Sequence, residues 1–439
     1  MRHDDDMISL EEALGRLDAA LAGARLPAET VPLRQAQGRV LAEVQHSRLD
    51  LPPFDKSAVD GYALPPGEAE RYEVMGTVAA GDAGSGPLAA GTAVKVMTGA
   101  PVPPGTERVV MVEDADLIDP RRGRDERSES GPLPPTGRIP CGHPATAAHP
   151  APPQTGATVL IRQRRGGANI CRQGEDVRVG DPLLAAGTTL GPLEVANLLA
   201  GGIAEVSAVR RPRLAIISTG EEIVDRIEDL GPGKIMNANG PLLAGLAHEY
   251  GLEVVSEKSY GDEPATLRAG VEAATERADL VVLSGGVSAG DFDYVPQVLQ
   301  ELGFQIHFSR VAVKPGKPVV FATGGAQVAL GLPGNPVSVY LTFHLFVLRA
   351  AARLTGAQPP LREVRQRLGE AFQRRNGERL EFVPARQTPE GRIVPVEFHG
   401  SAHLTALGGA DGFFRVPVGV TALAAGEEVA FVPLLRRAP

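Results

Sequence analysis

The sequence contains no tryptophan, and aromatic residues make up only 4% of its 439 residues. Its two cysteines, Cys141 and Cys171, are too few for a disulfide framework or a cysteine-based metal site. No segment approaches 18 consecutive apolar residues, which excludes a membrane span. The acidic N-terminus has no apolar stretch of the kind found in signal peptides. The net charge of −9 argues against a nucleic-acid-binding surface over the whole molecule. These absences predict a soluble cytoplasmic protein with no nucleic-acid or membrane partner.

The length and the abundance of glycine and proline predict several domains. Single hydrophobic cores usually stop growing near 250–300 residues. Gly (52) and Pro (38) together form about a fifth of the chain, against roughly 12% on average, so loops and β-structure should be plentiful. A chain of this kind is expected to combine α/β and β domains.

The first third of the chain predicts a linker domain that is interrupted by a β-rich module. Ser9, followed by Glu12 three residues later, opens an amphipathic helix to about Ala22. Short alternating runs between 71 and 117 indicate strands. We therefore predict a discontinuous mixed α/β linker domain over 8–50 and 159–208, with a β-rich inserted module over 51–158.

The segment 119–157 differs from its surroundings in composition. It contains nine prolines and almost no large apolar residues. Such a segment cannot bury enough apolar surface to offset the entropy lost on ordering. We predict that this insertion is disordered.

From Arg213 onward the sequence alternates between strand-like and helix-like segments. This alternation predicts a doubly wound parallel sheet over 209–357, with ligands bound at the carboxyl ends of the strands. The tail over 358–439 returns to short β runs, which indicate a small C-terminal β-barrel or sandwich. The predicted fold class is therefore multi-domain, α/β plus β.

Two glycine loops follow buried strands in the predicted doubly wound domain. The sequence reads DLVVLSGGVSAGDFDY over 279–294 and VALGLPGNPVSV over 328–339. Glycines let backbone N–H groups approach a ligand closely, and the N-terminus of a following helix favours anions. Each loop taken alone could also be an ordinary tight turn, since no Gly-Lys-Ser/Thr follows at the spacing of a phosphate-binding P-loop.

Charged residues lie beside these loops. Lys314 and Lys317 add positive charge, while Asp291 and Asp293 supply oxygen ligands for a divalent cation. Their alternatives are a charged surface turn for the lysines, and a helix cap with a solvated acid for the aspartates. Asp279, at the start of a strand, could simply accept a hydrogen bond from a loop N–H. Together the loops and charges indicate a site for a phosphorylated or oxyanionic small molecule and a metal ion.

A whole series of motifs in a fixed order then identifies a family resemblance. The series is LPPFDKSAVDGYAL, VMTGAPVP, GANICRQGEDV, ISTGEEIV, Asn239 before a helix, SGGVSAGDFDY, VKPGKP, GLPGNPVS and GSAHL. In these motifs the chain resembles the MoeA family of molybdopterin molybdenumtransferases, which includes the gephyrin E domain. The resemblance covers nearly everything from Ser9 to Leu434 apart from 119–157. Lys56, Val59 and Cys171 depart from the residues usual in the family, and Arg310 falls where some relatives have lysine.

The resemblance implies an enzyme with four domains, namely a MogA-like, doubly wound molybdopterin-binding domain, the inserted module, the linker domain and a C-terminal β-barrel. It implies a molybdopterin molybdotransferase that takes adenylylated molybdopterin and molybdate, releases AMP and yields molybdenum cofactor. It also implies Mg²⁺, and a homodimer with a composite active site. A molybdopterin adenylyltransferase and acceptor molybdoenzymes are the implied protein partners.

The same resemblance assigns the site residues. The implied catalytic residues are Asp60, Thr98, Asp176, Glu222, Asp279, Asp293 and Lys314, of which Asp293, Asp279 and Glu222 are the metal ligands. The implied cofactor-binding residues are Ser218, Thr219, Gly220, Asn239, Ser284, Gly285, Gly286, Ser288, Arg310, Lys317, Pro333, Gly334, Asn335, Pro336 and Ser401.

Two other functions are alternatives to molybdenum transfer. A non-catalytic, gephyrin-like dimeric scaffold would need no intact site, whereas the acidic site residues are all present. A related pterin- or nucleotide-binding hydrolase would explain 213–340 but not LPPFDKSAVDGYAL or GSAHL.

Overall fold

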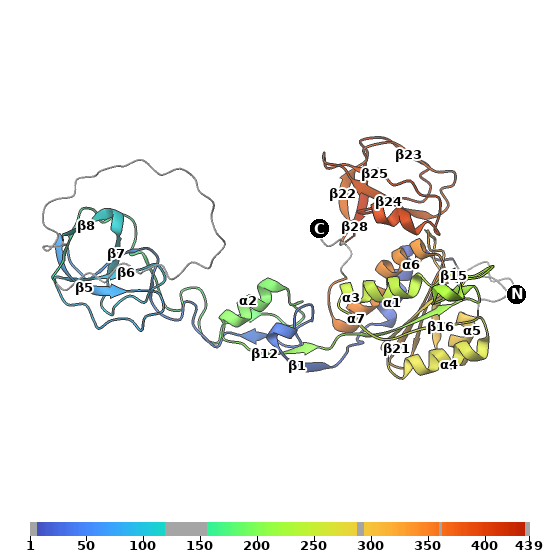
Figure 1. Ribbon diagram of the computed structural model, residues 1–439, viewed down its shortest axis with the longest axis horizontal. Helices are drawn as coiled ribbons and strands as arrows, with labels where there is room; N and C mark the ends of the chain where they lie inside the picture. The colour runs from blue at the N-terminus through green and yellow to red at the C-terminus, as the bar shows by residue number, and fades with distance from the viewer. Residues whose placement is uncertain (1–6, 119–155, 288–293, 360–361, 435–439) are drawn as a thin grey trace. The chain divides into compact units, whose positions relative to one another are not determined.

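The computed structural model describes residues 7–118, 156–287, 294–359 and 362–434 (Figure 1). These residues cluster into two compact units. Unit 1 comprises Met1–Val44, Ala185–Val195 and Glu205–Pro439, and unit 2 comprises Gln45–Leu184 and Ala196–Ala204.

Unit 2 contains the β-rich module that the sequence predicts. Its six-stranded sheet has the order β7-β4-β6-β5-β9-β8. The strands are β4 (Gly61–Leu64), β5 (Arg71–Val78), β6 (Thr92–Val96), β7 (Arg108–Met111), β8 (Ala115–Ile118) and β9 (Thr158–Ile161), with a 3₁₀ turn, η2, at Val112–Asp114. Unit 2 also contains two separate two-stranded sheets. In one, β2 (Gln45–His46) pairs with β11 (Pro182–Leu184), and in the other β3 (Lys56–Ser57) pairs with β10 (Ile170–Cys171).

One end of the predicted insertion belongs to this module. Residues 119–155, where we predicted disorder, lie outside the described residues. Ala157, which that prediction included, is instead buried in the module core. Its carbonyl accepts a hydrogen bond from Val74 N at 2.8 Å. Ala157 is therefore part of the module, because its carbonyl pairs with the backbone of β5.

The doubly wound domain is the centre of unit 1 (Figure 1). Its sheet has the order β16-β13-β17-β21-β20-β18. The strands are β13 (Arg213–Thr219), β16 (Glu253–Tyr260), β17 (Leu280–Ser284), β18 (Gln305–Arg310), β20 (Pro318–Gly324) and β21 (Gln327–Leu332). After β13 the chain forms a short parallel pair of strands, β14 (Ile223–Val224) with β15 (Ile235–Met236). A 3₁₀ turn, η3 (Ile227–Asp229), lies between these two strands in sequence.

The sheet is mixed rather than wholly parallel, which corrects our prediction. β16, β13, β17 and β21 are parallel, whereas β20 runs antiparallel to both of its neighbours, β21 and β18. β20 and β21 are joined by a tight turn at Gly325 and Ala326, and a parallel pair would need a crossover of a dozen residues or more.

Helices cover both faces of this sheet. On one face, α3 (Asn239–Glu249) and the continuous helix made of α6 (Pro336–Thr342), the π-helical turn η4 (Phe343–Val347) and α7 (Leu348–Thr355) pack into one apolar cluster. On the other face, α4 (Pro264–Thr275) and α5 (Val295–Glu301) pack into a second cluster. Alternate residues of β17 point to the two clusters, Leu280 and Val282 to the first and Val281 and Leu283 to the second, as expected for an interior strand.

The N-terminal helix α1 (Leu10–Ala20) packs in the same apolar cluster as α3 and α7. Its cap is the predicted one, since Ser9 Oγ accepts a hydrogen bond from Glu12 N at 3.0 Å. Its buried side chains, however, contact the doubly wound domain, which differs from our assignment of this helix to the linker domain. The buried stripe of α1 includes Leu10, Ala13 and Leu17.

The remaining linker elements are short. They are β1 (Ala28–Pro32), which pairs with β12 (Glu205–Val209), the 3₁₀ turn η1 (Leu33–Gln35) and the helix α2 (Pro192–Ala200).

The C-terminal β domain also belongs to unit 1. It contains β22 (Val364–Arg367), β23 (Phe372–Gln373), β24 (Leu380–Gln387), β25 (Ile393–Pro395), β26 (Gly412–Val416), β27 (Ala422–Leu423), β28 (Glu428–Pro433) and the 3₁₀ turn η5 (Leu404–Gly409). Its main sheet follows the order β19-β24-β26-β28-β22, and β25 pairs with β24. A parallel bridge between Leu368, which follows β22, and Ile393 of β25 returns the path to β24, as in the predicted barrel. The edge strand β19 (Val313–Lys314) comes from the doubly wound domain.

Among the described residues, one helix is long and apolar enough to cross a membrane, the 20-residue run Pro336–Thr355. Of its most apolar stretch, 83% is buried inside the fold. This helix is therefore a core helix of the doubly wound domain.

Candidate functional site

Three parallel strands end together at one edge of the doubly wound sheet. Ser218 of β13 lies beside Ser284 of β17, which lies beside Leu332 of β21. A cavity of about 500 Å³ opens at this edge. Its volume is within the range of small-molecule sites, and its place matches the rule for ligand binding in doubly wound sheets.

Most residues that the sequence predicted for cofactor binding gather here. Besides Glu222, the predicted residues in the wall of the cavity are Thr219, Gly220, Asn239, Gly285, Gly286, Pro333, Gly334, Asn335 and Pro336. They come from the ends of three strands and from the starts of α3 and the helix that begins at Pro336. The positive ends of two helix dipoles therefore face the cavity, an arrangement that favours a negatively charged ligand.

The loop after β17 accepts only glycine at its first position. Gly285 has φ +96°, and a Cβ added there would lie 2.4 Å from the carbonyl oxygen of Thr219. The next residue, Gly286, also has positive φ (+64°). The loop can therefore bring its backbone against the end of β13, which narrows this side of the cavity.

Asn239 fixes the start of α3 against both glycine loops. Its Nδ2 donates to Ser284 Oγ at 2.8 Å and to the carbonyl of Gly334 at 2.7 Å. Asn237 supports it from below, since its Oδ1 accepts from Gly240 N at 2.9 Å and from Ser218 Oγ at 3.1 Å. This network holds three of the predicted site residues, Ser218, Ser284 and Gly334, in one arrangement.

Two buried oxygen atoms in the wall have no hydrogen-bond partner among the described residues. They are Asn239 Oδ1 and Thr219 Oγ1, on side chains that are 8% and 3% exposed. A buried polar atom that lacks a partner costs about 1–3 kcal/mol, so native proteins rarely keep one without a use. Both oxygens can accept a hydrogen bond from a ligand, and a ligand with N–H groups fits them.

We expect Thr219→Val to separate binding from stability. Valine has almost the shape of threonine and removes only the unpartnered hydroxyl, so thermal unfolding should stay within about 1 kcal/mol of the parent protein. Affinity for the ligand of the cavity should fall about 10-fold, the cost of one lost hydrogen bond. Thermal denaturation and calorimetric titration of the same preparations measure the two effects. Thr275→Val, whose hydroxyl donates to the carbonyl of Glu272 within α4 and lies outside the cavity wall, is the control. Unchanged affinity in Thr219→Val would remove this hydroxyl from the site.

The C-terminal β domain contributes to the same cavity. Asn335 Nδ2 donates to Ser401 Oγ at 2.9 Å, and the carbonyl of Ser401 accepts from Val337 N at 3.1 Å. Ala402 is part of the wall. The structure thus brings Ser401, a predicted site residue, to the second glycine loop.

Asp279 does not lie at the cavity, which corrects its predicted role as catalytic residue and metal ligand. It precedes β17, at the opposite end of the strand from the glycine loop. Both of its carboxylate oxygens accept hydrogen bonds from Arg210 at 2.6 Å, and Arg213 N donates to it at 2.8 Å. The simpler alternative, an acid that satisfies a loop N–H, is the one that the structure shows.

Asp60 and Thr98, in unit 2, contact each other as a pair. The backbone N–H and the hydroxyl of Thr98 both donate to Asp60 Oδ1, at 2.6 and 2.7 Å. These two bonds hold the pKa of the Asp60 carboxyl below its ordinary value. Asp60 is exposed and ionised, as a residue that acts on a ligand should be. Asp176 is also exposed, in the same unit.

The predicted lysines flank the cavity wall without forming it. Lys314 and Lys317 lie on the turn that leads to Pro318, which is a wall residue. Arg310 ends β18 in the same region. Ser288 and Asp293, which were also predicted for the site, lie outside the described residues.

Sequence reasoning missed Asp262 and the pair Ile235 and Met236, which also line the cavity. Asp262 follows β16, so a strand-end rule applied to every parallel strand would have found it. Two hydrogen bonds link Glu221 and Asp262. Asp262 N donates to Glu221 Oε1 at 3.0 Å, and Glu221 N donates to Asp262 Oδ2 at 3.4 Å. The apolar pair forms β15, and no motif in this segment indicates ligand binding.

The described residues contain no group of three or more His, Cys, Asp or Glu side chains that could hold a metal ion by themselves. Glu222 and Asp262 are the carboxylates of the cavity wall. Mg²⁺ is commonly held by one or two carboxylates together with substrate phosphates, so this donor set fits Mg²⁺ only when the ligand supplies oxygens as well.

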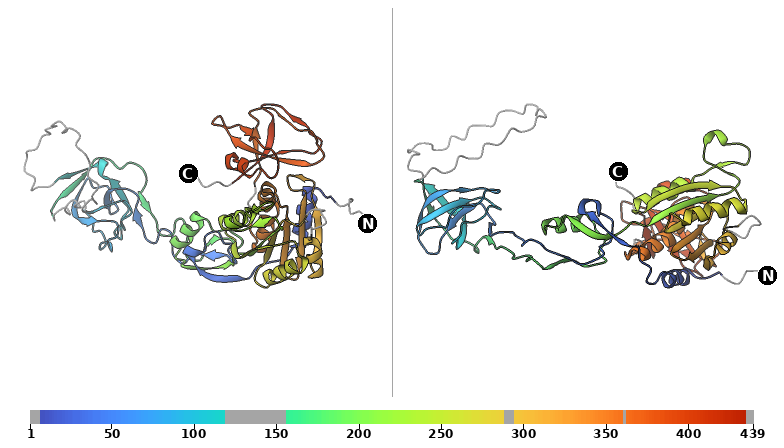
Figure 2. Two further views of the ribbon diagram at one scale, coloured as in Figure 1. Left: turned by 45° about the vertical axis from the view of Figure 1, so that its right-hand side comes forward. Right: turned by 90° about the horizontal axis from the view of Figure 1, so that it is seen from below.

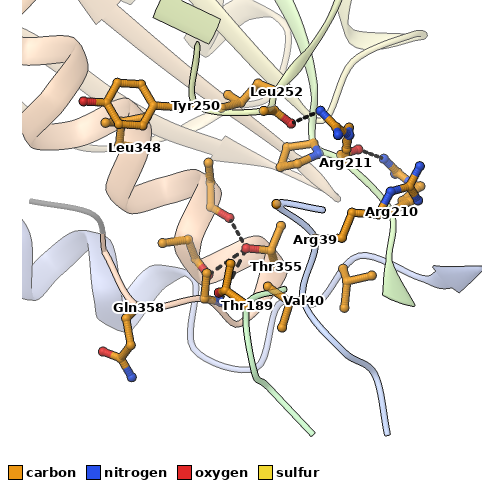
Figure 3. Close-up of a pocket in the computed structure, with 17 residues that line it drawn as sticks. Arg39, Val40, Thr189, Arg210, Arg211, Tyr250, Leu252, Leu348, Thr355 and Gln358 are labelled. Carbon is orange, nitrogen blue, oxygen red and sulfur yellow. Dashed lines mark hydrogen bonds between the residues drawn. The ribbon is translucent and has the colours of Figure 1, made fainter. Parts of the chain in front are cut away.

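A second cavity, of about 170 Å³, lies at the other end of the sheet (Figure 3). It is lined by the segments that precede β13 and β16 and by α7. Its arginines are already engaged: Arg39 pairs with Glu29, Arg210 with Asp279, and Arg211 donates to the carbonyl of Gly251. It offers neither glycine loops nor helix N-termini, and we do not place the functional site there.

Three family models match successive parts of the chain. Residues 8–202 match the MoeA N-terminal region (domain I and II), 215–353 a probable molybdopterin binding domain, and 367–434 the MoeA C-terminal region (domain IV). A molybdopterin molybdenumtransferase of Staphylococcus aureus (strain Mu50) is 30% identical over 435 residues, 96% of this chain and 94% of the relative. The chain belongs to the MoeA family. A Staphylococcus epidermidis protein of the same name is 29% identical over 411 residues, 91% of this chain and 89% of the relative.

Solved structures of the MoeA family agree. The molybdopterin biosynthesis MoeA protein of Pyrococcus horikoshii is 28% identical with a TM-score of 0.75, covering 98% of this chain and 100% of that one. A molybdenum cofactor biosynthesis protein of Pyrococcus furiosus, at 21% identity and a TM-score of 0.56, shares the fold. The predicted family and the multi-domain fold class are thereby confirmed.

Proposed function

We propose that this MoeA-family chain is a molybdenum insertase, which transfers molybdenum from molybdate into adenylylated molybdopterin and releases AMP. The observation that carries this proposal is the cavity at the end of the doubly wound sheet. It combines two glycine loops, two helix N-termini and two buried acceptor oxygens in one place. The glycine loops and the helix N-termini suit an anion. The acceptor oxygens suit the N–H groups of a pterin ring.

Each end of the substrate has a matching part of the site. The phosphates lie against the first glycine loop at Gly286, since Gly285 N already donates to the carbonyl of Leu332 at 3.1 Å, and near Lys314, Lys317 and Arg310. The pterin ring donates to Asn239 Oδ1 and Thr219 Oγ1. In the reaction water cleaves the phosphoanhydride bond, so that AMP leaves and molybdopterin keeps its own phosphate. The two dithiolene thiols bind molybdenum, and their protons leave with one molybdate oxygen as water. No protein thiol is needed for this chemistry.

We propose Glu222, together with Asp293, as the protein ligands of Mg²⁺. When bound, the ion would neutralise charge on the substrate phosphates as AMP leaves. Asp262 is the other carboxylate of the cavity wall. Asp279 is excluded from this set because Arg210 occupies both of its oxygens.

We further propose that the protein acts in the cytoplasm as a homodimer with composite active sites. Asp60 and Thr98 are then supplied by a partner subunit, and Asp176 acts from the same module. A molybdopterin adenylyltransferase would provide the substrate, and acceptor molybdoenzymes would take the product. The acidic residues of the site support catalysis over the alternative of a non-catalytic scaffold.

An assay with adenylylated molybdopterin, molybdate and Mg²⁺ tests the proposal. We expect AMP release that depends on molybdate and on Mg²⁺, together with formation of active molybdenum cofactor. AMP release without cofactor would support the hydrolase alternative. Substrate binding without either product would support the scaffold.

A further inference from the structure

Lys314 is held by the C-terminal β domain and not by its own domain. It belongs to the two-residue strand β19, whose parallel partner is β24. In this register Lys314 lies beside Glu381. Leu380 N also donates to the carbonyl of Ala312 at 3.0 Å. The backbone that carries Lys314 is therefore an added edge strand of another domain's sheet.

The side chain of Lys314 forms an ion pair across this boundary. Its Nζ lies 2.8 Å from Glu381 Oε1. The Glu381 side chain is only 9% exposed, whereas the Lys314 side chain is 49% exposed. An exposed pair between two flexible side chains contributes little, but here one partner is fixed by burial. The lysine side chain keeps about half of its surface exposed.

Glu381 is itself held in place by Arg374. Arg374 Nη1 donates to Glu381 Oε2 at 3.2 Å, and the arginine side chain is 4% exposed. The remaining Arg374 bonds go to backbone carbonyls, of Val420 at 2.6 Å, Pro417 at 2.5 Å and Arg379 at 2.8 Å. With its donors satisfied in this way, Arg374 cannot easily turn, so the carboxylate of Glu381 points steadily at Lys314.

The charge of this cluster stays positive. Glu381 carries one negative charge and is shared by Lys314 and Arg374, which leaves a net charge of about +1 at neutral pH. Arg379, whose Nη1 donates to the carbonyl of Val313 at 3.1 Å, adds another positive group beside the strand. The ion pair therefore orients Lys314 without cancelling the attraction of the site for an anion.

We propose that Glu381 is a positioning residue, which holds the Lys314 ammonium where it meets a phosphate of the substrate. This inference rests on the proposed function, because it takes Lys314 to bind the phosphate of the adenylylated substrate. It gives the C-terminal β domain a direct part in the reaction, through a carboxylate that does not itself contact the substrate.

A purely mechanical role for this ion pair is the alternative to exclude. The two domains are already joined by the backbone pairing of β19 with β24, which does not depend on the side chain at 381. Glu381→Gln keeps the size of the side chain and an oxygen for Arg374, but it turns an NH2 donor toward Lys314 and removes the charge that offsets buried Arg374. We therefore expect a lower thermal unfolding midpoint, and the kinetic comparison is made well below that midpoint, where the variant stays folded.

The test is a double-mutant cycle of Glu381→Gln and Lys314→Ala on kcat/KM. We expect Glu381→Gln to lower kcat/KM about 10-fold, in line with the cost of misplacing a group in an active site. In the Lys314→Ala background the same change should have less than about a twofold effect, because there is no ammonium left to position. Glu381→Asp keeps the charge but shortens the reach, and its loss should be intermediate. Equal effects in the two backgrounds, or an unchanged kcat/KM in Glu381→Gln, would overturn the proposal.

Glu11→Gln provides a matched control. Glu11 of α1 also pairs with the C-terminal β domain, through Arg415 Nη2 at 3.2 Å. If such pairs only join domains, Glu11→Gln and Glu381→Gln should behave alike. We expect Glu11→Gln to leave kcat/KM unchanged, and a matching loss in this control would count against positioning by Glu381.

Titration with AMP separates this inference from the proposed function. AMP carries a phosphate but requires no turnover. Weaker AMP binding in both Lys314→Ala and Glu381→Gln, with no further loss in the double variant, supports positioning even if molybdenum insertion is not observed. Unchanged AMP affinity in Glu381→Gln contradicts it, whatever the insertion assay shows.

Discussion

Gly285→Ala is expected to lower substrate affinity by about 100-fold, or roughly 3 kcal/mol. The added Cβ would lie 2.4 Å from the carbonyl oxygen of Thr219, and the residue has φ +96°. The backbone must therefore move away from β13, which breaks the alignment of the loop N–H groups with the phosphates. Calorimetric titration with adenylylated molybdopterin, or with AMP as a simpler probe, measures the loss.

Gly303→Ala is the matched control for this substitution. Gly303 has a similar positive φ, +82°, but a Cβ there meets nothing within 4 Å. This variant should lose about 1 kcal/mol of stability from backbone strain and keep its affinity. Equal affinities of Gly285→Ala and the parent protein would show that the loop does not hold the ligand.

Mixing two inactive variants, Asp60→Ala and Glu222→Ala, is expected to restore up to about a quarter of parental activity. Under the proposed composite site, each active site takes Asp60 from one subunit and Glu222 from the other. Random exchange makes half of the dimers mixed, and each mixed dimer has one intact site of two. Molybdenum insertion, assayed before and after subunit exchange, measures the recovery.

The control for this experiment combines Asp60→Ala with Thr98→Ala. Thr98 donates two hydrogen bonds to Asp60, so the two substitutions damage the same part of the site. Mixed dimers of this pair contain no intact site and should stay inactive. Recovery in neither mixture, with exchange confirmed by mass, would place all the catalytic residues on one chain.

The sequence predicted the strand ends well and the partners of single charges poorly. The glycine loops at Gly285 and Gly334 have a local signature in the sequence, whereas Asn239 was assigned only by the family resemblance. Asp279 has the same local signature as a site acid, since it adjoins a strand of the same sheet. Only the position of Arg210, 69 residues away in sequence, shows that its carboxylate is already bound.

The same limit applies to the sheet and to Glu381. Hydrophobic alternation predicted the strands of the doubly wound domain, but it did not distinguish the β20–β21 hairpin from a crossover. Glu381 carries no motif of its own, and its pairing with Lys314 depends on how two domains add their strands to one sheet. Contacts between distant segments are set by the tertiary fold, so a pattern within a short window cannot contain them.

The position of α1 has a consequence for how the chain is made. Asp18 on this helix bonds to Arg349 at 2.5 and 2.9 Å and to Arg353 at 2.7 Å, across 331 and 335 residues of sequence. At 5–20 residues per second, a ribosome needs roughly 15 to 70 s to synthesise the intervening chain. During that time the β-rich module of unit 2 can already fold, whereas α1 still lacks its native contacts. Leu10 and Leu17 therefore wait first for β18 and then for α7, the two elements against which α1 packs.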